Sequence, residues 1–250
     1  MSEKELDGRV AVVTGAGRNI GRAIALELAA GGAAVVVNVR SNQAEADAVV
    51  REIEGAGGRA LAALGDVADA AAMRAMAAAA AERFGRIDYL VNNAAIRREK
   101  FVGDMSFAEW REVIGVVLDG AFHCVQACLP HLRASGAGAV VNIGGLSAHT
   151  GSKNRVHVTA AKSGLIGFTR GLAHDLAADS VTVNCLAPGL IATAREAGSA
   201  EPQHHATNKT LTGKRGAAED VATTVRFLCG PGARYITGQT IHVNGGAFFG

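Results

Sequence analysis

The chain has 250 residues, of which 49% are apolar and 19% are charged, and its formal net charge is +2. This length and apolar content suit one large core in a single α/β domain. Lysine and arginine are scattered, with no basic block and no interleaved aromatic residues, which argues against a nucleic-acid-binding protein, and no apolar run approaches the length of a membrane span.

The first motif is a strand followed by a glycine turn and a helix. Val10, Val12 and Val13 form a short β-branched run, typical of a strand that is buried on both faces. Residues 14–17, Thr-Gly-Ala-Gly, end the run, and from Ile20 onward the apolar residues recur at helical spacing. Free N–H groups and the helix dipole at such a turn favour negative charge, so we expect a nucleotide phosphate there.

The second predicted strand, residues 33–39, ends where a dinucleotide fold contacts the adenosine ribose. An acid at this strand end would bind the ribose 2′-hydroxyl and select NAD, but the sequence has Val39 there. Arg40 follows the strand, and Arg18 lies in the glycine turn. Two guanidinium groups converging at this point suit a 2′-phosphate, so the sequence favours NADP(H) over NAD(H).

Helices and strands alternate along the rest of the chain. The predicted helices are residues 43–57, 69–84, 110–131, 156–176 and 217–228, and the predicted strands are residues 60–64, 87–91, 139–143, 181–186 and 241–243. This alternation predicts one domain over residues 1–250, a doubly wound parallel sheet with helices on both faces. The polar residues 194–212 are expected to form a mobile lid over the substrate, with His204 and His205 solvated.

The cysteines and the N-terminal residues bear on the cellular compartment. Cys124, Cys128, Cys185 and Cys229 have neither zinc-binding nor disulfide spacing, so we expect buried, reduced thiols and no metal site. Residues 1–7 are charged, and we expect no signal peptide there. Both observations favour a cytoplasmic protein.

Several motifs, spread over essentially the whole chain, resemble those of the short-chain dehydrogenase/reductase family. The glycine turn is similar to Thr-Gly-x-x-x-Gly-x-Gly, with Asn19 in place of the middle glycine; asparagine tolerates left-handed backbone. Residues 92–95, Asn-Asn-Ala-Ala, resemble the family's Asn-Asn-Ala-Gly, and residues 188–193 resemble its Pro-Gly-x-x-x-Thr segment at the nicotinamide. Asp66 stands where the family holds the adenine edge, and it is also a good N-cap for the next helix.

The resemblance implies a Rossmann-type fold and hydride transfer between a nicotinamide cofactor and a carbonyl carbon, as in members similar to 3-oxoacyl-(acyl-carrier-protein) reductases. Together with the glycine turn and the two arginines, it gives the candidate cofactor-binding residues Gly15, Gly17, Arg18, Asn19, Ile20, Gly21, Arg40, Asp66, Val67, Asn93, Ala94, Lys162, Pro188, Gly189, Ile191 and Thr193.

The catalytic positions of that family are altered in this sequence. The family uses an Asn, a Ser, a Tyr and a Lys to hold and protonate the developing alkoxide, and only Lys162 matches. The positions of the Tyr, the Ser and the Asn hold Val158, Gly145 and Val117. The wider spacing of some enoyl reductases would place the tyrosine at Arg155.

Lys162 can still hold the hydroxyls of the nicotinamide ribose, but the proton donor must come from elsewhere. Ser147, His149, His157 and Thr159 are polar residues near the altered positions, and a capping or surface role is also open to each of them. His149 is the strongest candidate of the four, because imidazole exchanges a proton near neutral pH. The candidate catalytic residues are therefore Lys162 and His149.

Three functions are compatible with these residues. The first is an NADP(H)-dependent oxidoreductase with altered proton handling, whose small-molecule substrate is an iminium or carries its own acid. The second is a non-catalytic nucleotide-binding protein, acting as a sensor or as a subunit of an assembly. The third is elimination or isomerisation in the old pocket. The resemblance also implies a homo-oligomer, a tetramer, formed through the long helices on either side of the strand at residues 139–143, and residues 247–250 add apolar surface.

Overall fold

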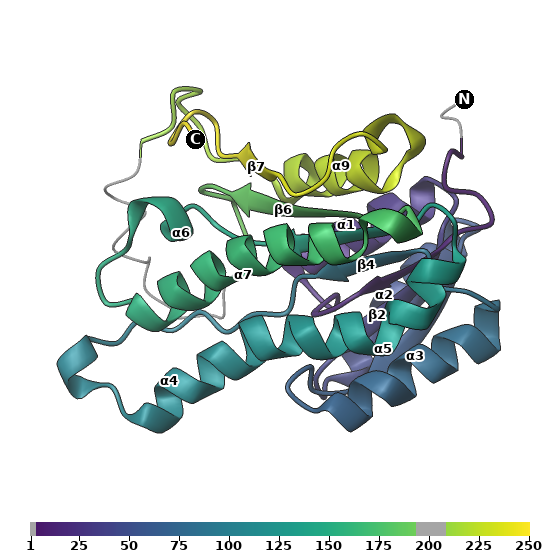
Figure 1. Ribbon diagram of the computed structural model, residues 1–250, viewed down its shortest axis with the longest axis horizontal. Helices are drawn as coiled ribbons and strands as arrows, with labels where there is room; N and C mark the ends of the chain where they lie inside the picture. The colour runs from purple at the N-terminus through teal and green to yellow at the C-terminus, as the bar shows by residue number, and fades with distance from the viewer. Residues whose placement is uncertain (1–3, 194–208) are drawn as a thin grey trace.

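Seven parallel strands form one sheet in the order β3-β2-β1-β4-β5-β6-β7, in a computed structural model that describes residues 4–193 and 209–250 (Figure 1). The strands are β1 (Val10–Val13), β2 (Ala34–Val39), β3 (Arg59–Leu64), β4 (Tyr89–Asn92), β5 (Ala139–Ile143), β6 (Thr182–Pro188) and β7 (Thr240–Val243). The α-helices are α1 (Asn19–Ala30), α2 (Gln43–Gly55), α3 (Ala70–Phe84), α4 (Phe107–Ile114), α5 (Gly120–Ala134), α6 (Ser147–Thr150), α7 (Val156–Asp175) and α9 (Ala218–Cys229). This is the predicted doubly wound fold.

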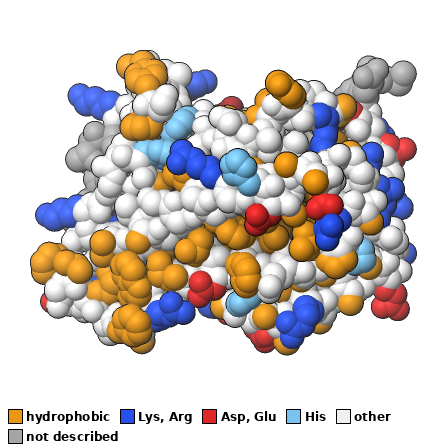
Figure 2. Space-filling model, in the orientation of Figure 1, with side chains coloured by type: hydrophobic (Ala, Val, Ile, Leu, Met, Phe, Trp, Pro, Cys, Tyr) orange, Lys and Arg blue, Asp and Glu red, His pale blue; other side chains and the backbone are white. Residues whose placement is uncertain are grey.

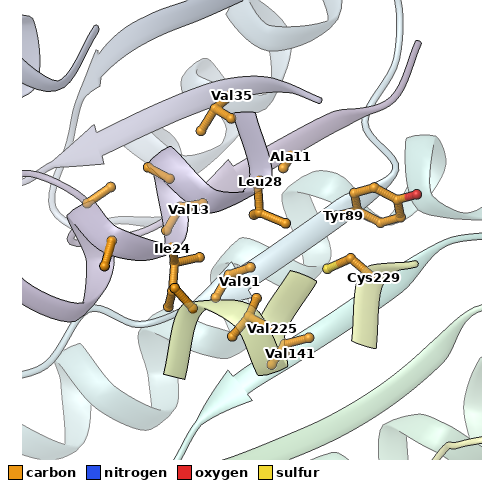
Figure 3. Close-up of a cluster of buried hydrophobic side chains, with 14 of the residues drawn as sticks. Ala11, Val13, Ile24, Leu28, Val35, Tyr89, Val91, Val141, Val225 and Cys229 are labelled. Carbon is orange, nitrogen blue, oxygen red and sulfur yellow. The ribbon is translucent and has the colours of Figure 1, made fainter. Parts of the chain in front are cut away.

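The two faces of the sheet bury separate apolar clusters, because successive side chains of a strand point to opposite faces. Ala11 and Val13 of β1 face α1, α2 and α9, as part of the cluster drawn in Figure 3. Val12, between them, faces α3 and α5 on the other side. Every residue of β1, β2, β4, β5 and β6 is buried, which explains why most residues of these strands are apolar.

The chain reverses its direction of travel across the sheet between β1 and β4. From β1 it proceeds outward to β2 and β3, then returns to place β4 on the other side of β1 and continues to β7. At such a switch point the connections leave in opposite directions, so a crevice opens at the carboxyl ends of the strands. The glycine turn after β1 and the Asn-Asn-Ala-Ala segment after β4 both lie at this crevice.

The long helix that sequence periodicity predicts over residues 110–131 is longer and is interrupted. Helices α4 and α5 are joined by the π-helical turn Gly115–Asp119 (η2) into one helical stretch, Phe107–Ala134. By length and composition this stretch passes the test for a membrane span, with a mean hydropathy of 1.5, so the expectation that no apolar run approaches that length was wrong. Its buried face includes Cys124, Cys128 and Leu132, which pack with α3 in the core of the domain.

Candidate active site

The glycine cradle is formed by Gly15, Gly17 and Gly21 at the junction of β1 and α1. It has no room for larger side chains at these positions. Gly15 has a positive φ of 61°, and Asn19 adopts the left-handed backbone expected of it, with φ 51°. A Cβ on Gly17 would lie 2.9 Å from the side chains of Val39 and Glu45. A Cβ on Gly21 would overlap the carbonyl oxygen of Gly15. This close-packed backbone at the N-terminus of a 12-residue helix fits a dinucleotide pyrophosphate.

Asn93 ties the end of β4 to this turn. Its Nδ2 donates to the backbone oxygens of Thr14, at 2.8 Å, and Gly15, at 3.0 Å. The hydroxyl of Thr14 accepts from the backbone N–H groups of Asn93 and Ala94. Ala95, which replaces the family's last glycine, is not among the described residues with positive φ, so the replacement causes no backbone strain there.

Replacing Gly21 with alanine tests the cradle. The new Cβ would overlap Gly15 O and lie 2.5 Å from Asn93 Nδ2, so two connected segments must shift. We expect Gly21→Ala to lower the free energy of unfolding by about 1–3 kcal/mol, measured by urea titration. Gly55→Ala is the control, since a Cβ there meets nothing within 4 Å and a helical alanine is favourable. Equal stability of Gly21→Ala and wild type would contradict this packing.

The adenosine-ribose end contains an acid that the strand pattern does not reveal. Val39 is buried at the end of β2, and Arg18 and Arg40 are exposed. Glu45, in the first turn of α2, reaches back to Gly17. Asn42 Oδ1 accepts from Glu45 N, which marks the start of α2 but does not show where the Glu45 side chain points.

At the predicted adenine edge, the roles of two aspartates differ from expectation. Asp66 is not the N-cap of the following helix, because its Oδ1 accepts only from Ala68 N, two residues on. The N-cap is Asp69, whose Oδ1 accepts from the N–H groups of Ala71 and Ala72. Val67, a predicted cofactor contact, is buried in the cluster with α3 and α5. Asp66 is therefore left available at the crevice rather than committed to a helix end.

A single pocket of about 120 Å³ joins several predicted cofactor residues at the carboxyl ends of β4, β5 and β6. Its lining residues from the predicted set are Ile20, Asn93, Lys162, Pro188, Gly189, Ile191 and Thr193. Gly189 is closely packed, because a Cβ there would lie 2.7 Å from Asn244. This arrangement places the predicted nicotinamide segment against α7 and the N-terminus of α1.

Lys162 of α7 is buried at the base of this pocket. Its Nζ donates a hydrogen bond to the backbone oxygen of Ile143, at the end of β5. Burial, followed by the nearby charges of Arg97 and Arg155, lowers the pKa of Lys162 from 10.5 to about 8. The amine is thus held in position by the strand end, and it loses its proton more easily than an exposed lysine.

This lowered pKa makes the stability of the fold depend on pH. The unfolded chain retains the Lys162 proton to a higher pH than the folded chain, so the contribution of this group to the free energy of unfolding should rise between about pH 8 and 10.5 and be lowest below pH 8. Urea titrations of wild type and Lys162→Met across this range check it. The free energy of unfolding of wild type minus that of Lys162→Met should increase as pH rises. A difference independent of pH would contradict the lowered pKa of Lys162.

The three altered catalytic positions lie in apolar or empty surroundings. Val117, in the π-turn η2, and Val158, on α7, belong to one buried cluster with Val113 and Leu165. Val158 also lines the pocket. Gly145 lines it too, and a Cβ there would meet nothing within 4 Å. Val117 and Val158 thus lie among apolar side chains, and Gly145 leaves open space.

Of the polar substitutes, only Ser147 lines the pocket. The His149 ring, in α6, instead packs against His242 at 4.5 Å and Phe248 at 5.1 Å between centroids. Burial and the charge of His242 lower the pKa of His149. His157 is 1% exposed and does not line the pocket, and neither does Thr159. The prediction of His149 as proton donor therefore has no support from its place in the fold.

Two lining residues that sequence reasoning did not place here are arginines. Arg97 follows the Asn-Asn-Ala-Ala segment, and Arg155 precedes the first residue of α7 and is 7% exposed. The periodicity of α7 gives no signal for Arg155, because this residue precedes the helix and its backbone is not helical (φ −136°, ψ 29°). Of the predicted lid, residues 194–208, with His204 and His205, lie outside the described residues.

Comparison with known proteins identifies the family of the chain. The family model described as enoyl-(acyl carrier protein) reductase matches residues 15–247. The 3-oxoacyl-(acyl-carrier-protein) reductase of Staphylococcus aureus is 40% identical over 239 residues, 95% of this chain and 97% of that protein.

Solved structures agree with this. A dehydrogenase/reductase from Sinorhizobium meliloti superposes with a TM-score of 0.92 at 35% identity, covering 99% of this chain and 98% of that one. A short-chain dehydrogenase from Burkholderia cenocepacia in complex with NADP gives a TM-score of 0.90 at 36% identity, covering 97% and 99%. The chain therefore belongs to the short-chain dehydrogenase/reductase family and is an oxidoreductase of that family.

Proposed function

We propose that this protein is an NADP(H)-dependent oxidoreductase whose site lacks the usual serine–tyrosine pair. When bound, the cofactor supplies or accepts a hydride at its nicotinamide ring. The glycine cradle, Asn93 and the Pro188–Gly189 segment would hold it along the crevice, and Lys162 would hold the ribose hydroxyls. The NADP complex of the related Burkholderia cenocepacia protein supports this choice of cofactor.

The replacement of the hydroxyl positions by Gly145 and Val158 carries the proposal of altered chemistry. Reduction of a carbonyl creates an alkoxide, which needs an acid and hydrogen-bond donors. Neither position offers one, and Val117 has no amide. An iminium carbon accepts hydride and becomes a neutral amine without a proton, and a carbonyl substrate that carries its own acid protonates its alkoxide itself. Both suit this site better than a simple ketone does.

An NADPH-oxidation assay against a panel of ketones and cyclic imines tests this proposal. We expect oxidation with imines at a rate well above that with matched ketones. Equal rates with both classes would contradict the altered proton handling. Absence of turnover together with tight NADPH binding would favour the second candidate, a non-catalytic nucleotide-binding protein, to which the apolar surroundings of Val117 and Val158 also point.

Cofactor preference is expected to depend on three charges at the ribose end. Arg18 and Arg40 favour a 2′-phosphate, whereas Glu45 beside Gly17 opposes it. By calorimetry, NADP(H) should bind more tightly than NAD(H). Arg40→Ala should weaken only NADP(H), and Glu45→Gln should strengthen only NADP(H), each by about threefold to tenfold for exposed charges. Equal affinity for both cofactors, or tighter NAD(H), would refute the preference.

The remaining expectations follow the family. We propose a small-molecule substrate and a cytoplasmic location, the latter because Cys124, Cys128, Cys185 and Cys229 are all buried and unpaired, as is usual in a reducing compartment. A homo-oligomer is also proposed, and its test is given in the Discussion.

A further inference from the structure

A primary amine lies at the base of the candidate pocket, bound to a neutral backbone group. Lys162 is 7% exposed and lines the pocket. Its Nζ donates to the backbone oxygen of Ile143, and across residues 4–193 and 209–250 it forms no ion pair. Buried lysines are usually paired with an acid. The described residues therefore neutralise none of its charge, and burial favours the uncharged amine.

The altered catalytic positions leave this amine uncovered on the pocket side. Val158 precedes Lys162 by one helical turn on α7, and both residues line the pocket. Valine has no hydroxyl that could bind the amine, and it is smaller than the tyrosine that the family has there. Gly145, two residues after the carbonyl that Lys162 contacts, leaves open space at its Cβ position. A substrate carbon can therefore approach the Lys162 amine from the side of the lost hydroxyls.

The protonation of Lys162 suits a nucleophile. Burial is the largest cause that lowers its pKa, to about 8. About half of the amine is therefore uncharged at pH 8, whereas an exposed lysine with a pKa of about 10.4 is almost wholly protonated. An uncharged amine can donate one N–H to Ile143 and still direct its lone pair elsewhere. This lone pair is what attacks an electron-poor carbon.

We propose that Lys162 is a nucleophile in the cofactor-free protein and condenses with a small aldehyde to form an imine. The nitrogen lone pair forms a bond to the carbonyl carbon as the C=O π bond breaks. The nitrogen then loses its two protons, the oxygen takes them and leaves as water, and the carbon–nitrogen bond becomes double. The Ser147 hydroxyl, which lines the pocket, can pass these protons from nitrogen to oxygen. The apolar lining residues Ala95, Leu190 and Ile191 suit an aliphatic substituent.

This inference goes beyond the proposed function, because imine formation needs no nicotinamide cofactor. The proposed function places the ribose hydroxyls against Lys162, so bound NADP⁺ should cover the same amine. A covalent imine divides elimination or isomerisation, the third function compatible with the sequence, into easier steps. The two roles of Lys162 therefore belong to two states of the pocket, and cofactor binding separates them.

Reductive trapping tests the proposal. The cofactor-free protein is incubated with butanal and sodium cyanoborohydride, which reduces an imine to a stable secondary amine, and the butylated lysines are located by peptide mass spectrometry. We expect at least about tenfold more butylation of Lys162 than of Lys153, an exposed lysine on the segment before α7, because burial enlarges the uncharged fraction of Lys162. Lys162→Met should remove this adduct, and Lys153→Met is the control and should leave it unchanged. In urea both lysines should react equally, because unfolding removes the burial.

The inference and the proposed function fail on different results. Equal butylation of Lys162 and Lys153 in the folded protein, or none of Lys162, refutes the nucleophile. Should Lys162→Met fail to fold, the wild-type peptide map carries the test, because it assigns the adduct to a residue. Saturating NADP⁺ should suppress butylation of Lys162, and binding without suppression would contradict the ribose role of Lys162 while the adduct supports the inference. Failure of NADP⁺ to bind, measured by calorimetry, would refute the proposed function alone, because the trapping uses no cofactor.

Discussion

With NADPH bound, the protein should reduce simple ketones far more slowly than the roughly 1–10³ turnovers per second of ordinary enzymes. Removing one preorganised oxyanion donor typically costs about 10²–10³ in rate, and losing general-acid help costs about 10²–10⁴. These losses do not simply multiply, because the groups act as a unit. Steady-state NADPH oxidation with cyclohexanone and acetoacetate esters as ketone probes gives the measurement.

Restoring the hydroxyls should raise this activity. Gly145 has open space at its Cβ position, so a serine fits without a clash, and Val158 lines the pocket, so a tyrosine ring there can extend into it. We expect Val158→Tyr with Gly145→Ser to increase ketone turnover by about 10²-fold, the lower end of a general acid's contribution. The matched control is Val158→Phe with Gly145→Ala, which adds nearly the same volume without either hydroxyl.

Two results would show this reasoning wrong. An equal gain in the control pair would mean that volume, and not the hydroxyls, limits the reaction. Ordinary turnover by the wild type would mean that another donor has taken over. In that case His149→Ala and Ser147→Ala identify it, and Ser147, which lines the pocket, is the better placed of the two.

The sequence predicts the sheet well because burial leaves a direct mark on it. The strand at residues 139–143 was placed correctly, since all five residues are buried and all except Asn142 are apolar. Asn19 also behaves as expected, since its left-handed φ of 51° is a local property of the turn. Family, fold and most pocket-lining positions therefore follow from short-range patterns.

Side-chain direction could not be predicted in this way, because it depends on packing between distant segments. Nothing local shows that Glu45 reaches Gly17 or that the His149 ring packs on Phe248. The same holds for Arg97 and Arg155, which become a pair only when the end of β4 meets α7. The sequence therefore predicted which catalytic groups the candidate substrate site lacks, but not the two arginines that line it.

The helices that flank β5 carry exposed apolar side chains, which predict that the protein forms a homo-oligomer. This is the second large expected effect. Phe107 of α4 is 76% exposed, Phe122 of α5 is 47% exposed and Val156 of α7 is 42% exposed. Figure 2 shows hydrophobic side chains gathered along the side of the molecule formed by these helices. The C-terminal residues contribute less than their sequence suggests, because Phe248 packs against His149 and His242, although Phe249 is 76% exposed.

Water contact along this helical face is unfavourable, and a contiguous apolar surface usually marks an interface. We therefore expect a homo-oligomer, a tetramer, by light scattering at micromolar concentration. Phe107→Asp with Phe122→Asp should convert it to smaller species, because burying unpaired carboxylates in the interface opposes association. Ala48→Asp adds a carboxylate to an exposed position of α2, which covers the opposite face of the sheet, and should leave the mass unchanged. A wild-type monomer would rule out the oligomer, and a double variant of unchanged mass would mean that the subunits associate through another surface.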